Sequence, residues 1–416
     1  MTRLAESAPS DATVRVAALD VAHSRRRSIA IVGPFDLPPV GVLDDRFRAM
    51  AAHGAITRLP LHPSTTSTRW SVAPEGRAAV LETAPLGPGE DPAVLAARVR
   101  TTHDQRGMQI ITAGDYLAID FSHGLGEVLM INSLVDSLLG NADPTDPEMW
   151  VRYRHRLSPL LVAALRTFAL DPRRALALAA ARNDRPAVEP ATGPPASPAP
   201  TTLAVGLPAE TVARVRRYRD AQLPGVSLVS LFTHALWRAL ADAGVPMSTV
   251  VKLPFDARRY LPEGRDTLAT FSAGLDFRIE PTKGPAALQE AMTAAARSGR
   301  PVANLLIGTL MTRRELLRGA GDEPAASPTG PIHLLHSSVG VLPRKGQWPF
   351  RDPAQARMLV ASDPADLNSI TVTSVTTMNN LWFTAEFHRS AIDPAKVRAA
   401  LDSIAEGAAT DSLAVI

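Results

Sequence analysis

The sequence contains no cysteine among its 416 residues. Disulfide bonds, cysteine nucleophiles and metal sites built from thiolates are therefore excluded. The sequence also has no continuous apolar run of about 18 residues, the length that a membrane-spanning helix needs. We therefore expect no membrane span, and we expect a cytoplasmic location.

The sequence has little net charge. Lysine and arginine together number 44 and aspartate and glutamate 41, which gives a formal net charge of +3. Such a small surplus, without a dense basic run interleaved with aromatic residues, argues against a nucleic-acid partner. With 45% hydrophobic residues, the chain is long enough for two ordinary domains or one large one.

Several motifs that mark well-known chemistries are missing as well. Gly124 and Gly126 follow an expected strand, but the third glycine of a dinucleotide-binding fingerprint falls on Leu129. The sequence has neither a phosphate-binding G-x-x-x-x-G-K-[ST] loop nor a G-x-S-x-G nucleophile elbow. His123 and Glu127 have the spacing of two ligands on one helix face, but H-E-x-x-H and a third ligand are missing. We therefore expect no metal site.

The segment from residue 110 to residue 140 is the most informative part of the chain. Its first half alternates apolar and smaller or polar residues, which is typical of a half-buried strand. The alternating apolar residues are Leu117, Ile119 and Phe121. From about Glu127 the apolar spacing becomes helical, and Gly140 suits the C-terminus of that helix. His123 therefore lies where a strand ends and a helix begins.

A histidine at such a junction can project into a cleft. Imidazole has an unperturbed pKa of ~6.5, so His123 could accept a proton from a substrate hydroxyl or amine near neutral pH. The other interpretation of the same residue is a histidine that is simply hydrogen-bonded at a turn.

Residues 122–128 read Ser-His-Gly-Leu-Gly-Glu-Val. This segment resembles a diverged form of the His-His-x-x-x-Asp-Gly motif of the chloramphenicol-acetyltransferase-like superfamily. That superfamily includes peptide-synthetase condensation domains, polyketide-associated acyltransferases and plant acyltransferases. His123 matches the second, catalytic histidine of the motif. Ser122 replaces the first histidine, Glu127 the aspartate and Val128 the glycine.

A second match covers residues 249–262 and the downstream segment 271–275. In the family that it resembles, this region carries an arginine that pairs with the acid of the histidine motif. A buried acid at a helix start needs a cation, and an arginine fork would hold the turn in place. The resemblance predicts an ion pair between Glu127 and Arg258, with Arg259 as the alternative. Without the resemblance, both arginines would be interpreted as surface residues.

A third match lies at residues 332–342, which resemble the Ser-Asn-x-Gly strand beside the catalytic histidine of the family. Ser338 takes the place of the asparagine. Its hydroxyl, or that of Ser337, could donate to an oxyanion. A plain core strand is the alternative interpretation, and we expect His333 and His336 to be structural.

The resemblance predicts an α/β sandwich of two similar chloramphenicol-acetyltransferase-like lobes with a channel between them. We expect a flexible N-terminus over residues 1–27 and an N-terminal lobe carrying the histidine motif over residues 28–182. A proline-rich linker over residues 183–202 and a C-terminal lobe over residues 203–416 follow. Residues 152–182 also have a helical pattern.

The function implied by the resemblance is acyl transfer from a coenzyme A or carrier-protein thioester to a hydroxyl or amine, in natural-product or lipid metabolism. His123 would act as general base without an acyl-enzyme. No tightly bound cofactor is expected, since the acyl-CoA or acyl-carrier thioester is a substrate. The expected partners are a small-molecule acceptor and an acyl or peptidyl carrier protein. Three alternatives stay open: an amide-forming, carrier-dependent condensation enzyme, a non-catalytic binding module that kept the fold, and a non-transfer reaction on a natural-product intermediate.

Overall fold

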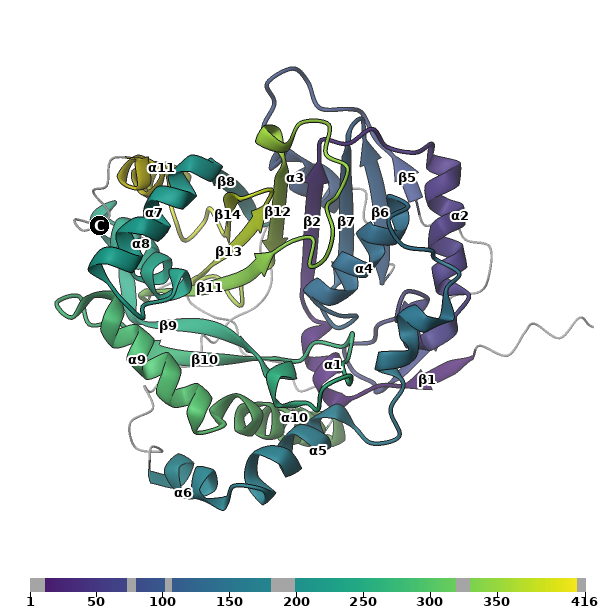
Figure 1. The fold of residues 1–416 in the computed structure, drawn as a ribbon, viewed down its shortest axis with the longest axis horizontal. Helices are drawn as coiled ribbons and strands as arrows, with labels where there is room; N and C mark the ends of the chain where they lie inside the picture. The colour runs from purple at the N-terminus through teal and green to yellow at the C-terminus, as the bar shows by residue number, and fades with distance from the viewer. Residues whose placement is uncertain (1–11, 73–79, 102–106, 181–198, 319–329, 410–416) are drawn as a thin grey trace, which may run out of the picture.

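The computed structural model describes residues 12–72, 80–101, 107–180, 199–318 and 330–409 (Figure 1). In these ranges the chain forms a mixed α/β fold with three sheets in two lobes. Most of the expected linker, residues 183–198, lies outside the described residues. Residues 201 and 202 of that linker already belong to the first strand of the second lobe, β8.

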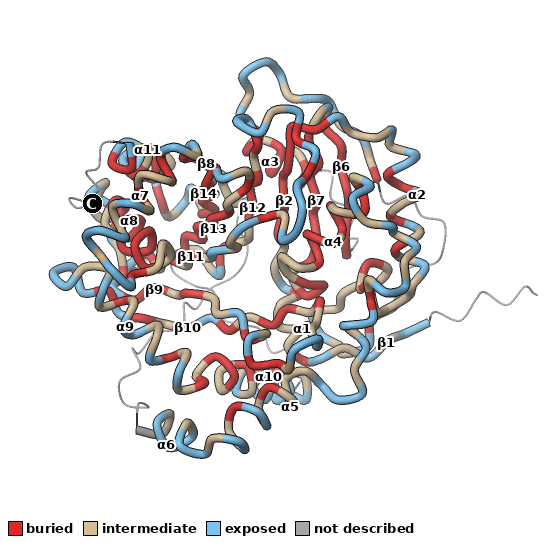
Figure 2. The backbone as a smooth tube through the Cα atoms, in the orientation of Figure 1, coloured by how far each residue is buried: buried red, intermediate tan, exposed pale blue. Residues whose placement is uncertain are grey.

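The N-terminal lobe is built on a five-stranded sheet in the order β12-β2-β7-β6-β5, antiparallel except for β5 and β6. Its strands are β12 (Arg357–Ser362), β2 (Arg27–Gly33), β7 (Tyr116–Ser122), β6 (Met108–Ala113) and β5 (Val80–Glu82). Its helices are α2 (Val40–Ala51), α3 (Val94–Thr101) and α4 (Val128–Leu138). One face of the sheet packs against α2 and α4 in one hydrophobic cluster, and the other face packs against α3 in a second cluster. Figure 2 shows the central strands as buried.

Strand β7 is more deeply buried than we expected. We expected a half-buried strand, but all seven residues of Tyr116–Ser122 are buried. The reason is that both faces of the sheet are covered, so the smaller residues between the large apolar ones are also removed from water. The expected helix after the strand is confirmed as α4, and Gly140 follows it with a φ of 84°.

The C-terminal lobe is built on a six-stranded sheet in the order β10-β9-β11-β13-β14-β8. Its strands are β10 (Ser272–Arg278), β9 (Met247–Asp256), β11 (Ile332–Val341), β13 (Ser369–Thr377), β14 (Asn380–Phe387) and β8 (Thr201–Leu207). Strand β11 runs parallel to both of its neighbours, and the other pairs are antiparallel. The helices of this lobe are α7 (Ala209–Gln222), α8 (Leu228–Asp242), α9 (Gly284–Arg297), α10 (Arg300–Arg318) and α11 (Pro394–Ala409).

The start of the chain is more ordered than we expected. Residues 1–11 lie outside the described residues, but residues 12–27, which we assigned to a flexible N-terminus, contain a strand and a helix. Strand β1 (Thr13–Arg15) pairs in a small third sheet with β4 (Arg69–Val72), which also pairs with β3 (Leu61–His62). Helix α1 (Ala18–His23) follows and packs against α10.

The second half of the sequence contributes one strand to the N-terminal sheet. Strand β12 belongs to the second half of the sequence but pairs with β2 along the edge of the N-terminal sheet, from Arg357 opposite Gly33 to Ser362 opposite Ser28. The expected boundary of the C-terminal lobe therefore has to be corrected at β12. Next to it, Arg100 of α3 forms an ion pair of 2.5 Å with the fully buried Glu386 of β14, which further ties the lobes together.

The prediction of one long helix over residues 152–182 is wrong. The structure has four short helical pieces there, because Pro159 and Pro172 each start a new helix. The pieces are η2 (Pro147–Tyr153), α5 (Pro159–Ala164), the π-helical turn η3 (Leu165–Ala169) and α6 (Pro172–Ala180). Three more short turns are η1 (Gly54–Thr57), η5 (Ala257–Tyr260) and η6 (Pro353–Gln355). Among the helices in the described ranges, none combines the length and apolar character needed to cross a bilayer.

Candidate active site

His123 lies in the turn between β7, which ends at Ser122, and α4, which begins at Val128. Its backbone is held from both lobes. The amide of His123 donates to the carbonyl of Arg26 at 2.8 Å, and the hydroxyl of Thr270 donates to the carbonyl of His123 at 2.7 Å. The position of this residue therefore depends on contacts from both halves of the chain.

The two glycines of the turn are needed for close packing. A Cβ atom on Gly124 would lie 2.5 Å from the carbonyl oxygen of Asp20, and one on Gly126 would lie 2.5 Å from that of Leu268. Real Cβ contacts are longer than this, so a side chain at either position would push the turn away from its neighbours. The glycines let α1 and the segment before β10 approach the histidine turn from two sides.

Arg58 also holds the turn, and sequence reasoning missed it. Its guanidinium donates to the carbonyls of Leu125 at 2.5 Å and Gly124 at 2.8 Å. It also forms an ion pair of 3.0 Å with Asp20, and both side chains are largely buried. No local pattern around Arg58 marks it, because its three partners come from two distant segments of the chain.

The predicted pair between Glu127 and Arg258 is present. Arg258 Nη1 lies 2.8 Å from Glu127 Oε2, and the two side chains are only 8% and 10% exposed. The same guanidinium donates to the carbonyls of Thr267 at 3.1 Å and Ala269 at 2.7 Å. The carboxylate also accepts a hydrogen bond from the amide of Phe271 at 3.3 Å. The pair therefore fixes the start of α4 against the segment before β10.

At neutral pH Glu127 is deprotonated and Arg258 is protonated. Burial by itself raises the pKa of Glu127, but Arg258 and, to a smaller extent, His123 more than offset that effect and lower the pKa. Burial likewise opposes the charge of Arg258, yet the Glu127 carboxylate raises its pKa overall. The alternative partner, Arg259, is exposed and lies beside the ring of Tyr260, so the alternative pairing is not used.

The ring of His123 packs against a second histidine, His23, at the end of α1. The ring centroids are 5.3 Å apart and the planes are nearly perpendicular, at 87°. His123 is half-buried, and its Nδ1 atom is buried with no hydrogen-bond partner in the described parts of the chain. We did not anticipate His23, because it lies in the segment that we expected to be flexible.

Both imidazoles are neutral near pH 7. Burial lowers the pKa of His123, and Arg26 acts in the same direction, while the Glu127 carboxylate opposes them. Burial, together with the neighbouring His123, lowers the pKa of His23 to about 3. A neutral imidazole is the form that can accept a proton.

The three serines of the prediction lie in different surroundings. Ser122 is buried, and its hydroxyl donates to the carbonyl of Ser24 at 3.4 Å, at the end of α1. On β11, Ser337 is half-buried and Ser338 is exposed. Neither β11 serine forms a hydrogen bond with His123 within the described ranges, so their role at an oxyanion stays a prediction.

His336, also on β11, has a structural environment. It is buried, with Nδ1 2.7 Å from the Thr233 hydroxyl and Nε2 3.0 Å from the Ser374 hydroxyl. Burial lowers its pKa to about 4. These contacts confirm the expectation that His336 supports the core of the C-terminal lobe.

A cavity of about 720 Å³ lies away from His123, beside η5 and α9 of the C-terminal lobe, and η3 and α6 also line it. We expected η3 and α6 in the N-terminal lobe, but α5 and η3 pack against the core of the C-terminal lobe, which corrects the expected boundary at residue 182. His123 does not line it, so the expected channel at this histidine stays a prediction. No group of three or more His, Cys, Asp or Glu side chains that could hold a metal ion occurs in the described ranges.

Comparison of the sequence with protein-family models gives no match, and comparison with curated proteins also gives none. The fold itself is the two-lobed fold that solved structures of an acetyltransferase, a polyketide synthase associated protein and a condensation domain share. The predicted resemblance is thus confirmed at the level of the fold.

Three solved structures illustrate this likeness. The trichothecene 15-O-acetyltransferase of Fusarium sporotrichioides matches with a TM-score of 0.60 at 13% identity, over 95% of this chain and 94% of its own. Polyketide synthase associated protein 5 of Mycobacterium tuberculosis matches with a TM-score of 0.57 at 15% identity, over 97% and 100%. The first condensation domain of the calcium-dependent antibiotic synthetase matches with a TM-score of 0.53 at 18% identity, over 94% and 93%.

Proposed function

We propose that this protein is an acyltransferase. It moves an acyl group from a thioester of coenzyme A or of a carrier protein to a hydroxyl or amine of a small-molecule acceptor, in natural-product or lipid metabolism. One observation carries the proposal: a neutral, half-buried His123 stands at a strand-to-helix junction whose backbone both lobes hold and whose helix start is bound by the Glu127–Arg258 pair.

In the proposed mechanism, His123 accepts the proton of the acceptor hydroxyl or amine as that atom attacks the thioester carbonyl. The tetrahedral intermediate collapses and breaks the carbon–sulfur bond, and the leaving thiolate takes the proton from the imidazolium. The acyl group passes directly to the acceptor, with no acyl-enzyme. A positioned base of this kind is worth typically ~10²–10⁴ in rate.

Other residues have supporting roles in this proposal. Glu127 and Arg258 hold the helix start and so position the histidine turn, to which Ser122 adds a hydrogen bond from the end of β7. Ser337 or Ser338 donates a hydrogen bond to the oxyanion. The thioester is a substrate, so the protein needs no tightly bound cofactor, and an acyl or peptidyl carrier protein is the partner if the donor is carrier-bound.

Two other functions have some support. Condensation domains share the fold, which favours an amide-forming reaction on carrier-bound substrates as the second candidate. The buried Nδ1 atom of His123, and the position of the 720 Å³ cavity away from this ring, favour a non-catalytic binding module as the third.

The test is His123→Ala in a transfer assay that follows thiol release and intact product mass over a panel of acyl-CoA and acyl-carrier donors. We expect turnover to fall by roughly 10²–10⁴. His53→Ala is the control, because His53 is a half-buried histidine at the end of α2, outside the site. Unchanged turnover in His123→Ala would exclude the base role. Acceptance of carrier-tethered amines alone would favour the condensation enzyme, and thioester binding without turnover in the wild type would favour the binding module.

A further inference from the structure

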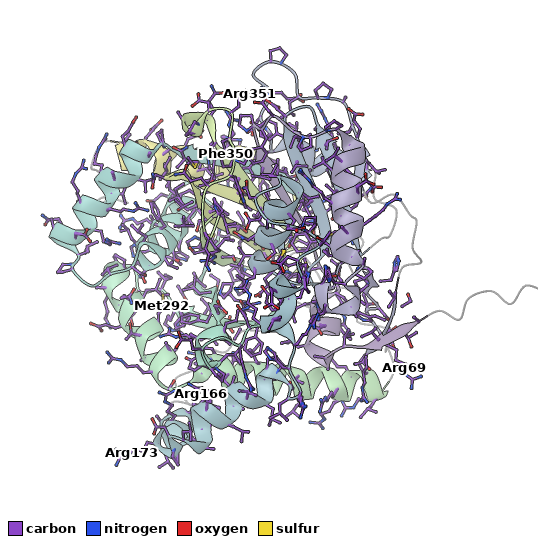
Figure 3. The ribbon with its side chains drawn as sticks, turned by 45° about the vertical axis from the view of Figure 1, so that its right-hand side comes forward. Arg69, Arg166, Arg173, Met292, Phe350 and Arg351 are labelled. Atoms are coloured by element: carbon purple, nitrogen blue, oxygen red, sulfur yellow. The ribbon has the colours of Figure 1, made fainter. Side chains whose placement is uncertain are left out.

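The 720 Å³ cavity of the C-terminal lobe has an unusual lining. It lies between α9, the short helix η5, the start of α8 and the pieces η3 and α6. Four arginines line it, and no aspartate or glutamate does so among the described residues. The arginines are Arg166, Arg174, Arg259 and Arg297. Figure 3 shows Met292 of α9 and Arg166 of η3, two of the lining residues, on one side of the molecule, across from Arg69.

Three of these arginines have no ion-pair partner within the described ranges, namely Arg166, Arg259 and Arg297. Arg174 has one, Asp171 at 3.2 Å, and both of these residues are half-buried. Adjacent Arg258, by contrast, has carboxylates of three residues within reach. The three unpaired guanidinium groups are exposed, so solvent screens part of their repulsion, and a bound anion would supply the acid that the lining lacks.

The walls of the cavity are held in place by hydrogen bonds. The buried Tyr260 donates its hydroxyl to the carbonyl of Ala296 at 2.6 Å, which joins η5 to α9. The side-chain oxygen of Gln289 accepts from the amide of Ser227 at 3.0 Å and the hydroxyl of Ser230 at 2.8 Å, which joins α9 to the start of α8. A ligand would therefore meet a preformed site, which lowers the free-energy cost of binding.

The lining also offers apolar surface. Phe255, Met292 and Val229 border the same space as the arginines. A ligand that is entirely ionic would leave these side chains uncovered, whereas one with an apolar body would cover them.

We propose that this cavity is a ligand site, separate from His123, that binds a small organic phosphate. The phosphate lies against the guanidinium groups and the apolar body lies over Phe255 and Met292. Arginine forks bind phosphate and carboxylate with two parallel hydrogen bonds, and several unpaired guanidinium groups match a dianion better than a single carboxylate. The phosphate group could belong to a soluble metabolite or to the head group of an anionic lipid.

The site is tested by isothermal titration calorimetry of the full-length wild type with octyl phosphate at fixed ionic strength. We compare the double variant Arg166→Gln/Arg259→Gln with the control Arg217→Gln/Arg313→Gln, which removes the same charge from exposed arginines outside the cavity. Octyl glucoside supplies the apolar chain without the anion. Sedimentation with phosphatidylcholine vesicles, with and without phosphatidic acid, distinguishes a lipid source from a soluble one.

We expect the wild type and the control to bind octyl phosphate with one site. The cavity variant should bind roughly 100-fold more weakly, or about 2.8 kcal/mol at 1.4 kcal/mol per tenfold, because it loses two charged hydrogen-bond donors. Three results would each overturn the proposal. The cavity variant could bind octyl phosphate as tightly as the control, the wild type could fail to bind octyl phosphate, or the wild type could bind octyl glucoside as tightly as octyl phosphate. If the double variant unfolds in a thermal melt, the exposed single change Arg297→Gln serves instead, with Arg217→Gln as its control and an expected weakening of at least tenfold.

Discussion

Arg258 and Glu127 are separated by 131 residues in the sequence, yet their side chains meet at 2.8 Å with most of their surface buried. Arg258 comes from η5 of the C-terminal lobe and Glu127 from the start of α4 in the N-terminal lobe. The ion pair therefore makes the geometry of the histidine turn a property of the whole chain.

We predict that Arg258→Ala lowers the free energy of unfolding by ~3–5 kcal/mol, because it leaves the buried Glu127 carboxylate without its cation. Two backbone carbonyls, of Thr267 and Ala269, also lose their donor. Urea denaturation at pH 7 measures the change. The control is Arg259→Ala, an exposed change one residue away, for which we expect less than about 0.5 kcal/mol. Equal effects of the two variants would contradict the structural role of Arg258.

We predict that Gly126→Ala destabilises the protein by ~1–3 kcal/mol and lowers acyl transfer. The new Cβ atom would lie 2.5 Å from the Leu268 carbonyl oxygen, so the turn has to move. Gly308→Ala in α10 is the matched control. Its Cβ atom meets nothing within 4 Å, and in a helix this change gains about 0.5–1 kcal/mol. A Gly126→Ala protein as stable and active as the wild type would show that the close packing is unimportant.

We predict that the acidic limb of the pH profile of kcat/KM has its midpoint below ~6.5, the ordinary pKa of histidine. The base has to be neutral, and folding lowers the pKa of His123 below its ordinary value. Arg26 contributes to this lowering, so Arg26→Gln should move the acidic limb to higher pH. The Glu127 carboxylate acts the other way, so Glu127→Gln should move it to lower pH. Shifts of the same sign in both variants would exclude His123 as the titrating group.

We predict that the protein loses stability as the pH falls from ~6.5 towards 4, partly through His336. Its folded pKa of about 4 lies below the unfolded value, so the unfolded state binds more protons in this window, and acid favours unfolding. Such a shift amounts to ~3 kcal/mol over the window. His336→Gln should make the dependence of unfolding free energy on pH shallower. Thr233→Val, which removes a hydrogen bond but keeps the imidazole, should leave the slope unchanged, and equal slopes for wild type and His336→Gln would refute the assignment.

The histidine junction could be predicted because it rests on a local pattern, and the partner in its ion pair could be predicted only through the family resemblance. The change from alternating to helical spacing around His123 locates the turn, and an acid at a helix start requires a cation. Arg258 was then identified through the family resemblance. Burial of β7 could not be predicted in the same way, because its smaller residues do not reveal that helices cover both faces of the sheet.

The contacts that sequence reasoning missed all join distant segments. His23 and Arg58 reach the histidine turn from segments whose own composition suggests no site, and the partners of Arg58 are backbone carbonyls, which no sequence motif marks. The arginines of the cavity are separated in the same way, since Arg166 and Arg297 lie in pieces far apart in the sequence. In each case the property that matters arises only when the chain has folded.

Strand β12 has a consequence for how the protein is made. The sheet that presents His123 lacks its outer strand until residues 357–362 have left the ribosome, so one side of β2 stays without its partner during most of translation. Open strand edges invite pairing with other chains, and pairings between remote segments form slowly. Chaperones should therefore bind nascent chains of this protein while the edge of β2 is unpaired. The N-terminal sheet should be completed late in folding, after β12 has been synthesised.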